Sequence, residues 1–107
     1  MKNGLILTAV AIVAAFTATT GFAQASGADT YKSKCMMCHA ADGSGNTPAG
    51  KSMQVPSLSS ADIVKMSDVD LIAATKNGKG KMPAYAGKLT DAQIKDVVAY
   101  IRTLQKK

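Results

Sequence analysis

The sequence predicts an all-α domain, and three observations point to this class. No stretch alternates apolar and polar residues for long enough to indicate a half-buried strand. Several segments begin after Ser or Thr, which are among the residues that most often cap helix N-termini. Near the C-terminus, apolar residues recur at intervals of three and four and form one helical face: Ile94, Val97, Val98, Ile101 and Leu104.

The C-terminal helix is the most clearly defined element. Thr90 and Gln93 form a capping box at its start, in which each side chain bonds to the backbone of the other residue. Lysines at the chain end complement the negative end of the helix macrodipole. Polar residues are expected on the outer face of this helix: Lys95, Asp96, Arg102 and Gln105.

The segments before this helix are expected to alternate between helix and loop. A first helix is predicted over 28–38, followed by a loop over 40–57 in which Gly and Pro recur. A loop of this length in a small domain is usually functional or wraps a bound group. Helices over 61–66 and 68–77 follow, and a second loop over 78–88, rich in Gly and Lys, leads into the last helix.

The two middle helices have recognisable ends. Ser59 or Ser60 is the expected N-cap of the first, and Ser67 is the expected N-cap of the second. Gly78 follows the second helix, where a residue without a Cβ atom readily adopts the left-handed conformation that ends a helix.

Residues 1–25 have the organisation of a secretory signal peptide. Lys2 gives a basic start, residues 4–22 are apolar and uncharged, and Ala23-Gln24-Ala25 is an A-x-A cleavage site. A retained membrane anchor is the alternative, but the apolar run is near the lower length limit for a span and four Thr residues dilute it. We therefore expect export, cleavage that leaves no stable membrane anchor, and a single mature domain over 26–107.

Cys35-Met36-Met37-Cys38-His39 has the C-x-x-C-H pattern of covalent haem attachment. Thiols of Cys35 and Cys38, on one helical turn, can each form a thioether with one vinyl group of haem. The imidazole of His39 then lies beside the iron and can bind it as the proximal ligand. We therefore expect one covalently bound haem c.

Three other interpretations of the cysteine pair are less consistent with the sequence. A thioredoxin-like dithiol is expected in a βαβ context, and no strand pattern is visible. A zinc site needs four ligands, whereas the chain has two Cys and one His. A structural disulfide in an exported protein is the third alternative.

A six-coordinate haem iron needs a second axial ligand, and the single His is already used. The thioether of a methionine suits this position and raises the reduction potential. Met82 is the strongest candidate, because it lies in the loop over 78–88, is followed by Pro83, and comes near the end of the domain. Met53 and Met66 are the alternatives, and Met66 is expected to fill a gap in the core.

The chain has a net charge of +6, with 13 basic and 7 acidic residues, and every acid is Asp. This surplus favours an acidic partner, because charge steers encounters between proteins. A solvated surface without such a role is the alternative. Nucleic-acid binding is not expected of an exported chain that has no basic stripe interleaved with aromatic residues. Four lysines are candidates for a docking ring: Lys51, Lys79, Lys81 and Lys88.

Together these motifs resemble those of the small monohaem class I bacterial cytochromes c. The resemblance rests on the C-x-x-C-H motif, on Gly-Lys-Gly-Lys-Met-Pro-Ala-Tyr at 78–85, and on Leu-Thr-Asp at 89–91 followed by Val-Ala-Tyr-Ile at 98–101. Their order and spacing cover essentially all of the mature chain. The resemblance implies an all-α class I cytochrome c fold with His/Met ligation, in which the N- and C-terminal helices cross around one covalent haem.

The resemblance also implies supporting residues. Gly27 and Tyr31 match positions on the first helix that meet an aromatic residue of the last helix, here Tyr100. Pro48 matches the proline whose carbonyl accepts the N–H of the proximal imidazole, a bond that fixes the tautomer of the ring. An ordinary turn proline is the alternative for Pro48. The chain has no Trp, so the Trp found near a propionate in some relatives is absent.

The expected function is that of a soluble one-electron carrier, not an enzyme, which moves electrons between redox proteins by Fe(II)/Fe(III) cycling. A haem peroxidase or gas sensor is the alternative, and it requires a labile sixth position on the iron. A module dedicated to one larger oxidoreductase is a third alternative that the sequence does not separate from a diffusing carrier. We expect a monomer in the periplasm, with the thylakoid lumen as the alternative compartment.

Overall fold

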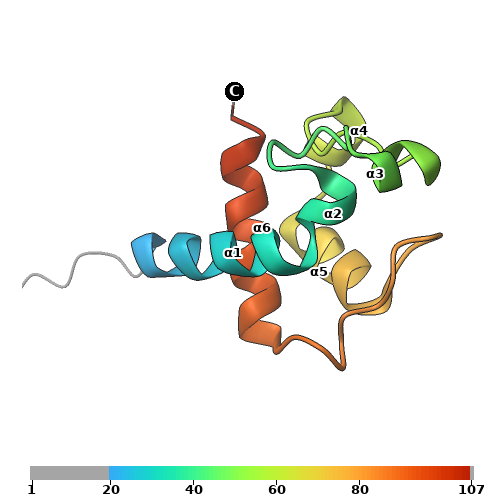
Figure 1. Ribbon diagram of the computed structural model, residues 1–107. Coiled ribbons are helices and arrows are strands. Elements are labelled where there is room, and N and C mark those ends of the chain that lie inside the picture. The colour runs from blue at the N-terminus through green and yellow to red at the C-terminus, as the bar shows by residue number, and fades with distance from the viewer. Residues whose placement is uncertain (1–19, 107) are drawn as a thin grey trace, which may run out of the picture.

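The computed structural model describes residues 20–106, with side chains from Ser26 onward. This part of the chain contains six helices and no strand (Figure 1). In chain order they are α1 (Thr20–Lys34), α2 (Met36–His39), α3 (Pro48–Ser52), α4 (Ala61–Val64), α5 (Asp68–Asn77) and α6 (Asp91–Leu104). The predicted all-α class is confirmed.

The predicted signal peptide lies largely outside the described residues, which begin at Thr20. α1 includes the last residues of that leader and continues into the mature domain. The division into a leader over 1–25 and a domain over 26–107 therefore stays a prediction. None of the helices found over 20–106 is long and apolar enough to cross a membrane.

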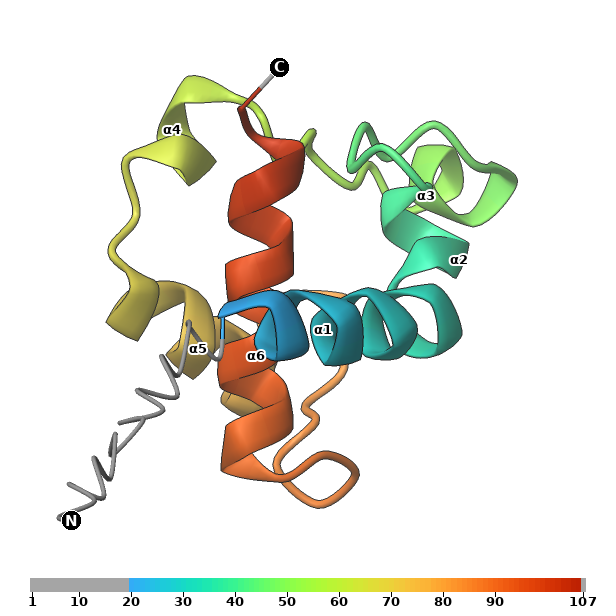
Figure 2. The ribbon, with the colours of Figure 1, turned by 90° about the vertical axis from the view of Figure 1, so that its left-hand side faces the viewer.

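α1 lies across α6, and the two helices meet at Gly27 (Figure 2). A Cβ atom at this position would lie 2.2 Å from the carbonyl oxygen of Asp96, so the two backbones approach through the space of a missing side chain. Beside this point the rings of Tyr31 and Tyr100 pack with their centroids 5.3 Å apart. The expected crossing of the terminal helices is confirmed.

α6 supplies most of the hydrophobic core. Ile94, Val97 and Val98 are each 2% exposed or less, as the apolar face of this helix predicts. Tyr31 of α1 and Leu58 from the connection between α3 and α4 belong to the same core and are also buried. The core therefore joins the first and last helices to the middle of the chain.

The helix ends follow the predicted capping residues. The Thr90 N–H donates to Oε1 of Gln93 at 2.8 Å, and the Gln93 N–H donates to Oγ1 of Thr90 at 3.1 Å. Oγ of Ser67 accepts from the Asp70 N–H at 3.1 Å. α5 ends at Asn77 and is followed by Gly78, whose φ of 78° is in the left-handed region. The predicted limits of α5 and the predicted start of α6 are confirmed.

Three predicted segments differ from the structure. The helix expected over 61–66 is shorter, because α4 ends at Val64. The helix expected over 28–38 is interrupted at Cys35, after which the chain continues as the separate turn α2. The loop expected over 40–57 contains α3, because Thr47 caps its start with a hydrogen bond of 2.9 Å and Pro48 occupies the first helical position. Thr-Pro is a local signal for the start of a helix. The glycines around it are typical of a loop, and the sequence therefore predicts a loop here.

Replacing Gly27 by alanine should destabilise the fold by about 1–3 kcal/mol, the usual cost of overpacking. The added methyl group would lie 2.2 Å from the Asp96 carbonyl oxygen, so α1 and α6 would have to move apart. Denaturant unfolding of the haem-loaded protein measures the change. Gly87→Ala is the matched control, because a Cβ atom there would meet nothing within 4 Å. An equal loss of stability in both variants would contradict the packing argument.

Candidate haem site

A cavity of about 480 Å³ lies in the half of the domain that contains α2, α5 and the loop over 78–88. Most of its lining is apolar and comes from separate parts of the chain, with Val55, Leu58, Leu71 and Ile101 among the contributors. Cavities of about 300–1,000 Å³ commonly hold cofactors and other small molecules. The cavity is therefore large enough and apolar enough to be a cofactor site.

Cys35 and Cys38 lie on one compact turn at this cavity. The Cys38 and His39 N–H groups both donate to the Cys35 carbonyl, at 3.2 and 2.9 Å. Both thiols are free, half-buried and part of the cavity lining. Burial, and then the neighbouring Cys38, raise the pKa of the Cys35 thiol to about 11. Redox-active dithiols have a lowered thiol pKa, so the raised pKa of Cys35 does not fit a thioredoxin-like role.

His39 ends α2 with its ring half-buried beside the cavity. Burial lowers the pKa of the imidazole, which favours the neutral form that binds metal ions. Its Nδ1 atom is buried and has no hydrogen-bond partner in the described part of the chain. Pro48, the expected acceptor, is exposed in the first turn of α3. The bond between Nδ1 and the Pro48 carbonyl therefore stays a prediction.

The Tyr31 hydroxyl holds the backbone that follows His39. It donates to the carbonyl oxygen of Ala40 at 2.5 Å, and the Tyr31 side chain is only 1% exposed. Ala40 has φ 68° and ψ 165°, a conformation that a residue with a Cβ atom adopts only at an energetic cost. The hydrogen bond thus fixes a strained residue directly after the candidate iron ligand.

Met82 lies in the loop that follows α5. Its N–H donates to the Lys79 carbonyl at 3.0 Å, and the Lys79 N–H donates to the Met82 carbonyl at 3.2 Å, so this part of the loop closes as a tight turn. The half-buried Met82 side chain lines the cavity, and so do Met53 and Met66. The structure therefore brings all three predicted thioethers to one cavity, and the choice of Met82 as iron ligand stays a prediction.

Tyr85 ties this loop to two helices, a role that sequence analysis missed. Its N–H donates to the Thr75 carbonyl at 3.0 Å, and its hydroxyl donates to the Lys34 carbonyl at 3.1 Å. Lys34 directly precedes Cys35, so one side chain connects the loop of Met82 with the attachment turn. The bonded residues are 51 positions apart in the chain, and no local pattern could have indicated their contact.

These residues fit a haem held between the two ends of the domain. Two thiols and an imidazole lie on one turn, thioethers line the same apolar cavity, and the buried Nδ1 of His39 is available for a supporting bond. A zinc site gains no support, because no group of three His, Cys, Asp or Glu side chains over 20–106 is arranged to hold a metal ion. The fold and the site together define a c-type cytochrome.

Comparisons with known proteins identify the family. The family described as cytochrome C oxidase, cbb3-type, subunit III matches residues 22–101. Cytochrome c6 of Thermostichus vulcanus is 35% identical over 106 residues, which cover 94% of this chain and 91% of the relative. Cytochrome c6 of Synechococcus elongatus is 38% identical over 78 residues, which cover 72% of this chain and 85% of the relative. The chain belongs to the small monohaem class I cytochromes c and carries one covalently bound haem c.

A solved structure agrees with this assignment. The KustC0563 c-type cytochrome superimposes with a TM-score of 0.68 and is 28% identical in sequence. The superposition covers 75% of this chain and 98% of that chain, so the likeness extends over nearly the whole length of the solved chain.

Tyr31→Phe should lower the free energy of unfolding by about 1–3 kcal/mol at neutral pH, because the buried Ala40 carbonyl loses its donor. Burial raises the pKa of the Tyr31 phenol above its ordinary value of 10.0. Because the phenol has a higher pKa in the folded state, its contribution to the free energy of unfolding is complete below pH 10.0. This contribution is lost as the pH rises further, because the phenol of the unfolded state then loses its proton first.

Denaturant unfolding of the wild-type and Tyr31→Phe proteins, from neutral pH to above pH 10.0, measures this difference. The variant has no phenol to ionise at this position, so the stability gap between the two proteins should narrow in the alkaline range. If the difference in unfolding free energy between the two proteins stays constant or increases with pH, the buried Tyr31 hydroxyl does not stabilise the fold in this way.

Proposed function

We propose that the mature protein is a soluble, exported one-electron carrier rather than an enzyme, and that His39 and Met82 bind the haem iron from opposite sides. The observation that carries this proposal is that the attachment turn and the Met82 loop line the same cavity. If the chain occupies both axial positions, the iron has no open position for a substrate, and electron transfer is the chemistry left. The likeness to cytochromes c6 supports the same conclusion.

Each part of the site has a task in this function. When bound, the haem supplies an iron that exchanges one electron between Fe(II) and Fe(III). Cys35 and Cys38 retain the group covalently in both oxidation states, and the apolar lining excludes water. The hydroxyls of Tyr31 and Tyr85 hold the backbone of the two ligand-bearing segments. A site held in this way changes little in shape when the electron arrives or leaves.

A peroxidase or gas sensor is the alternative function. It needs a labile sixth position and a polar distal group that steers bound oxygen. His39 is the single histidine of the chain, and Arg102 is the single arginine. Arg102 donates its hydrogen bonds to Asp68 and to the Met66 carbonyl and is not part of the cavity lining. The usual distal groups are therefore engaged elsewhere, and the carrier function is better supported.

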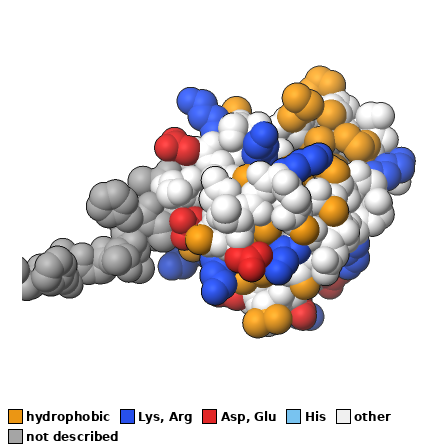
Figure 3. All heavy atoms as spheres, turned by 90° about the horizontal axis from the view of Figure 1, so that it is seen from below, with side chains coloured by type: hydrophobic (Ala, Val, Ile, Leu, Met, Phe, Trp, Pro, Cys, Tyr) orange, Lys and Arg blue, Asp and Glu red, His pale blue; other side chains and the backbone are white. Residues whose placement is uncertain are grey.

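Lysines at the cavity support docking to an acidic redox partner. Lys79 and Lys81 line the cavity together with Lys34, whereas Lys51 and Lys88 are exposed outside its lining. On the face drawn in Figure 3, basic side chains are spread among apolar ones instead of forming a single patch. A surface of this kind suits weak, short-lived complexes, which a carrier needs because it must leave its partner after each transfer.

We further propose that the mature protein acts as a monomer in the periplasm, with the thylakoid lumen as the alternative compartment. The basic start, apolar run and A-x-A site of residues 1–25 support export. Covalent attachment of haem c to Cys35 and Cys38 takes place outside the cytoplasm, so export and cofactor agree.

Met82→Ala should lower the reduction potential and open the iron to added imidazole, because thioether ligation raises the potential and blocks the sixth position. Optical spectra of the oxidised protein should lose the weak near-infrared band of the Met–Fe(III) bond. Met53→Leu and Met66→Leu are matched controls that keep an apolar side chain at the cavity, and both should retain the band. Retention of the band in Met82→Ala would assign the ligand to another residue.

Electron transfer to an acidic redox protein should slow as salt is added, because the screening length falls from about 10 Å at 0.1 M to about 3 Å at 1 M. Replacing Lys79 and Lys81 together by Gln should reduce the rate at low salt and flatten the salt dependence. Stopped-flow mixing measures both effects. Lys95→Gln, at an exposed position of α6 outside the cavity lining, controls for the loss of charge alone. An unchanged salt dependence in the double variant would contradict docking at the cavity.

A further inference from the structure

The segment over 58–66 forms one wall of the haem cavity, and of its residues only Leu58 is buried, while Ile63 packs against the core half-buried. Leu58, Ile63 and Met66 line the cavity. Leu58 is buried at the start of the segment, but α4 buries none of its residues, and Val64 at its end is 45% exposed. A wall of this kind needs another interaction to hold it against the rest of the domain.

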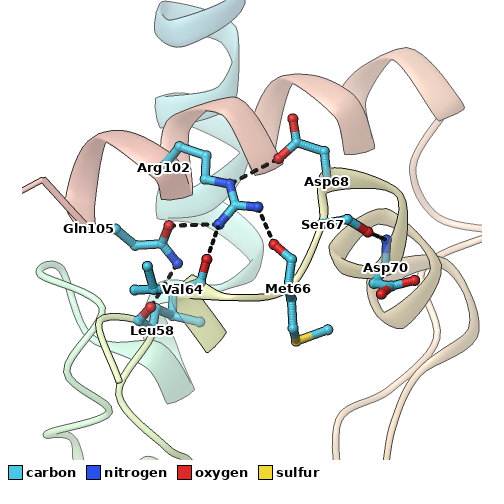
Figure 4. A network of polar contacts seen from close by, with 8 residues as sticks. All are labelled: Leu58, Val64, Met66, Ser67, Asp68, Asp70, Arg102 and Gln105. Carbon is cyan, nitrogen blue, oxygen red and sulfur yellow. Dashed lines mark hydrogen bonds and ion pairs between the residues drawn. The ribbon is translucent and has the colours of Figure 1, made fainter. Parts of the chain in front are cut away.

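Arg102 supplies that interaction from α6 (Figure 4). Its Nε donates to Oδ1 of Asp68 at 2.9 Å, and its Nη2 donates to the Met66 carbonyl at 2.5 Å. Its Nη1 donates to the Val64 carbonyl at 3.4 Å. The sequence predicts Arg102 on the outer face of the last helix, but the side chain is only 25% exposed, because the connection between α4 and α5 packs over it.

Gln105 extends the same network to the start of the wall. Its Oε1 accepts from Nη1 of Arg102 at 3.0 Å, and its Nε2 donates to the Leu58 carbonyl at 2.7 Å (Figure 4). The amide oxygen therefore accepts from the guanidinium, and the amide nitrogen donates to the backbone. Arg102 of α6 and Gln105, which caps the C-terminus of that helix, thus hold the wall at its two ends, Met66 and Leu58.

A guanidinium suits this position because of its geometry. It is planar, always charged, and presents five N–H donors in fixed directions. Here it meets the Asp68 carboxylate, two backbone carbonyls and the Gln105 amide oxygen at once. An ammonium group carries the same charge but cannot reproduce this fork. Ile101, the residue before Arg102, lines the cavity, so the helix that carries the network also contributes to the cavity.

We propose that Arg102, together with Gln105, is a positioning residue that holds the wall over 58–66 against α6 and so keeps water out of the haem cavity. The inference rests on the proposed function, because the wall shields the haem iron. Access of water raises the local dielectric constant and favours the more highly charged oxidised iron. Loosening the wall therefore lowers the reduction potential.

The test compares haem-loaded Arg102→Met and Arg102→Lys proteins with the wild type by hydrogen exchange and by redox titration. The hydrogen-bonded amides of Val64, Lys65 and Met66 should exchange roughly ten to a hundred times faster in both variants, as expected when hydrogen bonds to a charged group are lost. The reduction potential should fall in both. Lys95→Met removes an exposed charge from the same helix. It should leave hydrogen exchange unchanged and shift the reduction potential less than Arg102→Met does.

Three results would overturn the inference. If Arg102→Lys behaves as the wild type in both measurements, charge and not the hydrogen-bonding fork is what matters. If exchange becomes faster without a change in potential, Arg102 supports the fold but does not position the cavity wall. If Lys95→Met shifts the potential as much as Arg102→Met does, the effect is one of net charge.

Gln105→Leu keeps the test decisive if Arg102→Met yields no haem-loaded protein. It removes the donor to the Leu58 carbonyl and should speed exchange near Leu58 and lower the potential; unchanged values would count against the network. A wild-type spectrum without the Met–Fe(III) band would instead disprove the proposed function. Exchange in the Arg102 variants would then still show whether the network holds the wall.

Discussion

The close contact of α1 and α6 at Gly27 sets the position of the haem site. Because the two backbones approach through the space of a missing side chain, the end of α1 brings Cys35 to the cavity while α6 presents Ile101 to it. Tyr31 couples this contact to the site, since its ring packs on Tyr100 and its hydroxyl bonds to the backbone after the attachment motif. A displacement of one helix along the other would move the attachment turn relative to the rest of the cavity.

Three side chains hold the backbone around the cavity in the same way, by donating hydrogen bonds to carbonyl groups. The pairs are Tyr31 with Ala40, Tyr85 with Lys34, and Arg102 with Met66. Each pair fixes a different segment: the turn after His39, the loop of Met82, and the wall over 58–66. The Tyr31 bond is buried, where a carbonyl that loses its donor is costly, whereas the Arg102 bond is part-buried and the Tyr85 bond is exposed. The lining itself stays mainly apolar.

Local patterns in the sequence were enough to predict the capped helices, the attachment turn and the presence of methionines at the cavity. α3 was missed although Thr47-Pro48 is a local start signal, because neighbouring glycines indicated a loop. The contacts of Tyr85 and Arg102 had no such signal, since their partners lie 51 and 34 positions away in the chain. Periodicity placed Arg102 on the outer face of its helix. The connection between α4 and α5 covers that face, and this is a property of the tertiary fold alone.

The haem also completes the packing of a small domain. α6 buries Val97 and Leu104 in a cluster with Tyr31 and Leu58, while Ile101 is only partly buried and borders the cavity. Small domains bury a low fraction of their surface and often need a covalent or metal-based support. An apolar cavity of this size would otherwise expose its lining to water at a cost of about 25 cal/mol for each Å². Covalent attachment therefore does more than retain the redox group: it ensures that the group that fills the apolar interior stays in place in both oxidation states.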